Sequence, residues 1–311
     1  RSLCDWSSDV CSSDLISMLN SRKQEFFKGF ILATVTVFLL LPLIVYSWWC
    51  FSRPSQTNYK QKLFKGIVYK RNFNLSARPV LVHIVTVDLS VPGVKVLVTP
   101  PQYTGKTNTT LARTTSKFLQ QFNLLLAVNA NYFYPFRENT PWDYYPYSGD
   151  ITSVVGQAIS NGKHYSKAHR KWGVLCISTK GRAQILEDGN CPQNTLQAVA
   201  GRDVFIINGK AVNSDFGKDK PYPRVAVATN KEGNILWLIV VDGKQPLYSE
   251  GVTIAELTSI ARKLGAYKAL NLDGGGSTTL VMAKNKKPKL LNAPSHTKLP
   301  MRERQIGRAH V

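Results

Sequence analysis

Two Asp-Gly turns carry the residue types and spacing that best suit chemistry. Asp242-Gly243 follows one apolar run, and Asp273 opens a second turn that continues through three glycines. Consecutive glycines let a ligand approach the backbone and expose N–H groups that bind anions such as phosphate. An Asp-Gly pair alone is usually only a turn, but two pairs at one sheet edge favour a binding site.

A strand–helix–strand unit must position these turns. Ile235–Val241 is a continuous apolar run, which is typical of a strand covered on both faces. Apolar residues recur on one stripe across 253–264 and predict a helix, and 268–272 predicts the next strand. This order predicts a parallel βαβ unit, which would place both Asp-Gly turns at the same edge of the sheet.

Four other polar residues are candidates for the same site. Glu256 matches a capping box with Thr253, so its carboxylate either closes the helix start or faces the turns. Asn129 and Asn131 follow a short apolar strand and point to one side, where amides suit sugar hydroxyls; turn formation is the alternative. Arg224 begins a strand and is either a fixed cation for phosphate or part of a surface ion pair.

The remaining pattern predicts an α+β fold: one globular domain with a mixed sheet that contains the parallel βαβ unit. A helix is expected at 109–122. An aromatic-rich loop at 132–147 suits stacking on sugar rings or packing of the loop itself. Strands are expected at 80–89, 94–98, 124–128, 173–177, 204–207 and 225–229.

The N-terminal region predicts a single membrane crossing. Residues 30–49 contain no charged side chain and are long enough to span a bilayer. We expect an uncleaved signal anchor, with 16–29 in the cytoplasm, and a cleaved signal peptide is the alternative. A polar linker, 50–62, then leads to an extracytoplasmic domain at 63–304. Residues 1–15 and 305–311 resemble translations of opposite strands of one sequencing adapter, so we expect both to be artefacts.

Composition adds limits on partners. The chain has 40 Lys and Arg against 19 Asp and Glu, a net charge of +21. These cations are spread along the chain without a nucleic-acid motif, so we expect a membrane surface or an anionic substrate rather than nucleic acid. Cys176 and Cys191 are either a disulfide or two thiols, and the absence of a CxxC pair disfavours a thiolate zinc site.

Six segments resemble, in order, motifs of the phosphodiester glycosidase family, over about residues 64–304. They read AVNANYF (127–133), AVAGRDVFIINGK (198–210), YPRVAV (222–227), VVDGK (240–244), GVTIAEL (251–257) and ALNLDGGGSTTLV (269–281). Thr278 departs mildly from the family pattern, which has a second serine there. The family pattern also continues beyond Arg304 into a further strand. Bacterial relatives commonly carry one N-terminal membrane segment and are linked to exopolysaccharide.

The resemblance implies a membrane-anchored hydrolase that cleaves sugar-1-phosphodiester bonds in exported or envelope glycans. The products are a free sugar and a phosphomonoester. Its candidate catalytic residues are Asp273, Asp242 and Glu256. Its candidate substrate-binding residues are Asn129, Asn131, Arg224, Asn271, Gly274, Gly275, Gly276, Ser277 and Thr278.

Two alternatives stay open. The first is a non-catalytic, membrane-tethered protein that binds anionic envelope polysaccharide. The second concerns cofactors: none is expected, but a divalent cation on Asp242 and Asp273 is the alternative.

Overall fold

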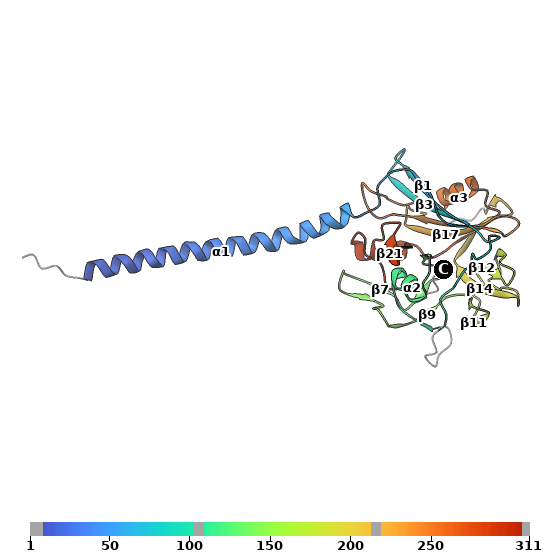
Figure 1. Ribbon diagram of the computed structural model, residues 1–311, viewed down its shortest axis with the longest axis horizontal. Coiled ribbons are helices and arrows are strands. Elements are labelled where there is room, and N and C mark those ends of the chain that lie inside the picture. The colour runs from blue at the N-terminus through green and yellow to red at the C-terminus, as the bar shows by residue number, and fades with distance from the viewer. Residues whose placement is uncertain (1–8, 102–108, 213–218, 307–311) are drawn as a thin grey trace, which may run out of the picture. The chain divides into compact units, whose positions relative to one another are not determined.

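Figure 1 shows a computed structural model of the chain, which describes residues 9–101, 109–212 and 219–306, with side chains from residue 22 onward. The chain forms two compact units, Arg1–Phe51 and Ser52–Val311.

The first unit is dominated by one long helix, α1 (Asp9–Phe51), which has Pro42 inside it. Its part Arg22–Phe51 is long and apolar enough to cross a membrane, a property that signal sequences share. The span expected at 30–49 lies within it. The helix begins inside the segment 1–15.

The second unit is built on an eight-stranded sheet in the order β1-β2-β3-β18-β17-β19-β15-β16. Every neighbouring pair in it is antiparallel. Its strands are β1 (Tyr59–Phe64), β2 (Ile67–Asn74), β3 (Val80–Asp88), β15 (Asp203–Ile207), β16 (Lys210–Ala211), β17 (Arg224–Thr229), β18 (Ile235–Val241) and β19 (Lys268–Asn271). β1 therefore starts within the segment expected to be a linker.

The predicted parallel βαβ unit is wrong. β18 and β19 do not pair with each other, because β17 lies between them and is antiparallel to both. The continuous apolar run of β18 reflects burial on both faces, which an antiparallel sheet also provides when both its faces are covered. Since β18 and β19 still run in the same direction, Asp242 and Asp273 leave the sheet at one edge, as expected.

Four smaller sheets complete the domain, all with antiparallel pairs. The five-stranded sheet has the order β11 (Lys163–Ser166), β10 (Ala158–Ser160), β14 (Thr195–Gly201), β12 (Gly173–Ser178), β13 (Ala183–Leu186). The three-stranded sheets are β21 (Lys287–Leu290), β20 (Leu280–Lys284), β5 (Leu126–Val128), and β4 (Thr109–Leu111), β9 (Ile151–Val154), β6 (Phe133–Tyr134). The last sheet pairs β7 (Arg137–Glu138) with β8 (Tyr144–Tyr145).

Among the described residues of this unit, the helices are α2 (Thr115–Gln121) and α3 (Ile254–Lys263), with the short 3-10 turns η1 (Gly275–Ser277) and η2 (His296–Lys298). The helix expected at 109–122 is shorter, because its first residues form β4 and Thr114 caps α2 by accepting from the Lys117 amide. The strand expected at 94–98 is also wrong, since that segment has no regular structure.

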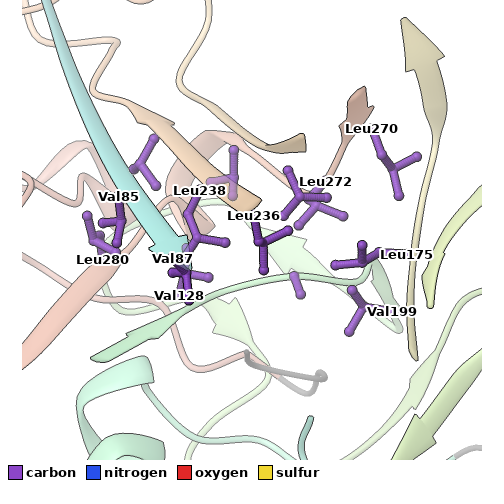
Figure 2. Close-up of a cluster of buried hydrophobic side chains, with 14 of the residues drawn as sticks. Val85, Val87, Val128, Leu175, Val199, Leu236, Leu238, Leu270, Leu272 and Leu280 are labelled. Atoms are coloured by element: carbon purple, nitrogen blue, oxygen red, sulfur yellow. The ribbon is translucent and has the colours of Figure 1, made fainter. Parts of the chain in front are cut away.

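The core lies on both faces of the large sheet. On one face, Leu236, Leu238 and Val240 pack with apolar side chains of the five-stranded sheet and of β5 and β20, as Figure 2 shows for part of this cluster. On the other face, Ile239 and Val241 pack with apolar side chains of α3.

A disulfide joins the five-stranded sheet to the connection between β13 and β14. Cys176 on β12 forms a disulfide with Cys191, 15 residues later in the chain. This decides between the two alternatives that the sequence left open.

Candidate functional site

The glycine turn after β19 is held closed by the side chain of Asn129. Its Nδ2 donates to the Asp273 carbonyl at 2.6 Å, and its Oδ1 accepts from the Thr279 amide at 2.9 Å. Asn129 is fully buried. Because both polar atoms of its amide are used within the protein, Asn129 fixes the shape of the turn.

The glycines allow close packing of this turn against 222–224. A Cβ on Gly274 would lie 2.3 Å from the Pro223 carbonyl oxygen, and one on Gly275 would lie 2.9 Å from the Tyr222 hydroxyl. Gly275 also has a φ of 62°, a conformation that favours glycine.

Several N–H groups of the turn are already bonded within it or to 223. The Gly275 amide donates to the Pro223 carbonyl at 2.9 Å. The Ser277 and Thr278 amides donate to carbonyls of the same turn at 3.3 and 3.1 Å. These three amides thus have acceptors within the protein, and anion binding by the backbone of the turn stays a prediction. A positively charged side chain also lies at the turn.

That side chain is Arg304, which lies against Gly276. A Cβ on Gly276 would fall 2.5 Å from Arg304 Nη2. Arg304 is 7% exposed and donates through Nη1 to the Ser277 hydroxyl at 3.0 Å. Its guanidinium carbon lies 4.5 Å from the centre of the Phe136 ring. The guanidinium is thus fixed on three sides at the surface of the glycine turn.

Glu138 on β7 balances the charge of Arg304. Its carboxylate forms an ion pair with Arg304 Nη2 and accepts from the Thr297 amide at 2.6 Å. Burial alone would raise the pKa of Glu138, but the contact with His296, the charge of Arg304 and the bond from the Thr297 amide lower it to about 2. Glu138 is therefore ionised throughout the physiological range.

His296 completes the cluster and is 2% exposed. Arg304 Nε donates to its Nδ1 at 3.2 Å, while Glu138 Oε1 lies 3.5 Å from the same nitrogen. An unprotonated Nδ1 accepts from Arg304, and a protonated one donates to Glu138, so only one contact holds at a time. Burial lowers the pKa of His296, which favours the neutral ring. Since Nδ1 of that ring accepts from Arg304 Nε, its proton is on Nε2.

Buried polar atoms without a partner in the described chain gather around the turn. His296 Nε2, Thr278 Oγ1, Asn271 Oδ1 and Asn131 Oδ1 are all of this kind. The other polar atom of the Asn131 amide, Nδ2, donates to the Val155 carbonyl at 3.3 Å. Buried polar groups are almost always hydrogen-bonded, so these atoms suit the hydroxyl and phosphate groups of a ligand.

The backbone beside His296 is strained. Thr297, Lys298 and Met301 have φ values of 54°, 61° and 60°. A β-branched residue such as Thr297 rarely adopts this conformation, and such strain clusters at functional sites. The bonds of Thr297 and Arg304 to Glu138 hold the strained segment in place.

Asp242 has a supporting position beside this site. Its Oδ2 contacts His83 Nε2 at 2.9 Å, and its Oδ1 accepts from Asn292 Nδ2 at 2.9 Å and from the Ala293 amide at 3.0 Å. The carboxylate is 1% exposed. With both oxygens occupied, Asp242 anchors the segment that leads to His296, and little capacity remains for a substrate or a cation.

Glu256 and Arg224 are likewise engaged by protein groups. Glu256 forms the capping box with Thr253 and an ion pair with Arg78, so the capping alternative is the one observed. Arg224 pairs with Asp219 at 3.0 Å, and Asp219 also accepts from the first amide of α3 at 2.6 Å. Their use by a substrate stays a prediction.

Asp273 and Lys244 remain close to the turn. Asp273 is 8% exposed, and its amide donates to the Ala130 carbonyl at 3.0 Å. At the outer side, Lys244 Nζ donates to the Tyr222 hydroxyl at 3.0 Å, the same hydroxyl that lies against Gly275. A carboxylate and an exposed cation thus flank the turn.

Within the described residues, no three His, Cys, Asp or Glu side chains gather in a way that would hold a metal ion. The cation alternative at Asp242 and Asp273 stays a prediction. Both oxygens of Asp242 already contact protein groups, which leaves little capacity for a cation.

Three residues of the site, Glu138, His296 and Arg304, were not singled out as candidates from the sequence. They come from segments far from the glycine turn in the chain. The family pattern around Arg304 was the one signal that pointed toward any of them.

Arg304, His296 and Glu138 thus form a charged cluster against the glycine turn, where β19 ends. The chain belongs to the phosphodiester glycosidase family, whose pattern matches residues 122–311. This confirms the resemblance seen in the sequence.

Solved structures show the same fold. The catalytic domain of zebrafish N-acetylglucosamine-1-phosphodiester alpha-N-acetylglucosaminidase, auto-inhibited by its pro-peptide, is similar with a TM-score of 0.55 and 20% identity. That match covers 85% of this chain and 91% of the zebrafish chain. A hypothetical protein from Synechocystis is similar with a TM-score of 0.60 and 14% identity. That match covers 82% of this chain but only 63% of the Synechocystis chain. No curated protein matches the chain.

Proposed function

We propose that this protein hydrolyses sugar-1-phosphodiesters at the bond between the anomeric carbon and oxygen. One observation carries the proposal: Arg304 and the unpartnered His296 Nε2 lie at the glycine turn that bears Asp273. Water supplies the hydroxyl that replaces the phosphate on the anomeric carbon, and the phosphate leaves as a phosphomonoester.

The phosphate would be bound by donors rather than by the glycine amides. Arg304 is charged and fixed, His296 Nε2 carries a proton without a protein acceptor, and Lys244 adds an exposed cation. A phosphomonoester is a stable anion, so its departure needs little protonation. Stabilising its charge in a buried site is the larger demand.

Asp273 is the carboxylate best placed to assist at the anomeric carbon. It would act as a nucleophile or as a base that activates water, depending on its distance to a second carboxylate. Asn131 and Asn271, each with a buried oxygen that lacks a partner, would accept bonds from sugar hydroxyls.

A location outside the cytoplasm fits this chemistry. The apolar helix Arg22–Phe51 would anchor the chain in a membrane, and the Cys176–Cys191 disulfide is typical of an oxidising compartment. Phosphodiester-linked envelope or exported glycans, exopolysaccharide among them, are then the substrates within reach.

Isotope labelling tests the reaction directly. The full chain in detergent micelles is incubated with an alkyl sugar-1-phosphodiester in H₂¹⁸O, and both products are analysed by mass spectrometry. Cleavage at the anomeric carbon places ¹⁸O in the free sugar, whereas cleavage at phosphorus places it in the phosphate. The experiment is repeated with a panel of sugar-1-phosphodiesters. If the protein binds them but releases no product from any, it is instead a non-catalytic polysaccharide binder.

A further inference from the structure

A polar cavity lies apart from the glycine turn, against the first strands of the large sheet. Its volume is about 400 Å³. The residues that line it include Arg53, Arg71 and Lys289, and no carboxylate lines it among the described residues. Such a cavity suits an anion.

Its arginines are held in place by neighbouring groups. Arg71 donates through Nε to the Thr57 carbonyl at 3.0 Å and through Nη2 to the Ser55 hydroxyl at 2.8 Å. Arg53 lies 4.3 Å from the centre of the Tyr248 ring. Because these contacts fix the guanidinium groups before a ligand arrives, less side-chain entropy is lost when an anion binds.

Neither Arg71 nor Lys289 forms an ion pair with any residue in the described part of the chain. The rest of the wall combines hydroxyl and amide groups with apolar side chains, namely Ser52, Ser55, Gln61, Met282, Leu290 and Leu291. A ligand with a phosphate and an adjoining apolar part matches this lining.

The position of the cavity in the chain indicates the source of that ligand. Residues 52–55 line the cavity, and Ser52 is bonded to Phe51, the last residue of the apolar helix. Residues that directly follow a membrane span lie at the level of the lipid headgroups. We infer that this cavity binds the phosphate headgroup of an anionic phospholipid.

The inference depends on insertion of the apolar helix into a membrane but not on the hydrolase reaction. It also gives a role to Arg53, a cation that follows the apolar helix. Headgroup binding would hold the domain at the membrane surface.

Native mass spectrometry of the full chain tests the inference. Protein in micelles is titrated with phosphatidylglycerol or phosphatidylcholine, and lipid-bound species are counted. We expect preferential retention of phosphatidylglycerol, and about a 25-fold loss of that affinity in Arg71→Gln/Lys289→Gln, about fivefold for each cation. Hydrolysis in detergent should be unchanged in this variant, so failure of one proposal is distinguishable from failure of the other.

A matched control replaces neighbouring cations on the same two strands. Lys70→Gln/Lys287→Gln removes the same charge from β2 and β21, outside the lining of the cavity. Its lipid retention should equal that of the wild type. Equal retention of the two lipids by the wild type, or an equal loss in both double variants, would overturn the inference. Titration with inorganic phosphate separates the sources: a cavity that binds phosphate but shows no lipid preference is a site for the soluble ion, which also overturns it.

Discussion

Arg304 and Gly276 are in a contact that no other residue at 276 would permit. The guanidinium lies where a Cβ on Gly276 would come within 2.5 Å of Nη2. The absence of a side chain at Gly276 therefore makes room for the guanidinium group of Arg304.

Gly276→Ala should displace Arg304 and lower the rate of hydrolysis about 100-fold, since a shift of about 1 Å can cost this much. Overpacking should also destabilise the domain by about 1–3 kcal/mol. Steady-state kinetics and thermal unfolding in micelles measure both effects.

Repeating this substitution in an Arg304→Ala background is the control. Without the guanidinium, the added methyl group has room, so Gly276→Ala should then cost little stability. An equal cost in both backgrounds would show that the contact does not matter.

Glu138→Gln should weaken the loss of unfolding free energy that the wild type shows at acid pH. The folded pKa of Glu138, about 2, lies below its ordinary value of 4.5. The carboxylate therefore contributes its stability above about pH 4.5 and loses it as the pH falls toward 2, up to about 3 kcal/mol. Thermal unfolding of wild type and Glu138→Gln between pH 2 and 7 should diverge at high pH and converge at low pH. Parallel curves across the range would contradict the ion pair.

His296 should add a second acid-sensitive window at higher pH. Burial lowers its folded pKa below the ordinary value of 6.5, so the unfolded chain takes up the proton first. Stability is therefore present above about pH 6.5 and declines as the pH falls below it. His296→Gln should remove this decline while leaving the window of Glu138, and a decline that persists in His296→Gln would assign it to another group.

Asp273→Asn should abolish hydrolysis while leaving the fold intact. Loss of the carboxylate should lower kcat by about 100-fold to 10,000-fold, the range for a group that acts on protons or covalently. Asp188→Asn, at an exposed position, is the control and should keep full activity. Undiminished turnover in Asp273→Asn would remove it from the mechanism.

Asp242→Ala should do the opposite, with a large effect on stability. The substitution would leave His83, Asn292 and the Ala293 amide without the acceptor that they share. Asp242 is only 1% exposed, so water would not easily replace it. Loss of such a buried network costs about 3–5 kcal/mol. A fully stable variant would contradict the supporting role assigned to this residue.

Removal of the disulfide by Cys176→Ser/Cys191→Ser should destabilise the domain by about 3 kcal/mol, because the bond closes a loop of 15 residues. The melting temperature should fall by about 6–12 °C in a domain of this size. Cys50→Ser, which changes a cysteine outside the disulfide, should leave it unchanged. A double variant that melts at the same temperature as the wild type would contradict this contribution.

Local patterns alone determined much of the C-terminal third. The run Ile235–Val241 is β18, and the capping box with Thr253 begins α3. These features depend on neighbours in the chain, which the sequence displays directly. The run did not reveal strand order, because burial on both faces gives the same apolar pattern whichever strand lies alongside.

The composition of the site was decided by tertiary structure. Glu138, His296 and Arg304 lie outside the helices and strands that the sequence predicts. They meet only because the paired strands β7 and β8 and the strained segment 297–301 reach the glycine turn. The same packing engages Asp242, Glu256 and Arg224 with protein partners. The sequence by itself determined that a glycine turn and an acidic residue stand at one sheet edge. Only the fold decided which charges face that turn, because long-range packing sets the partners of each buried polar group.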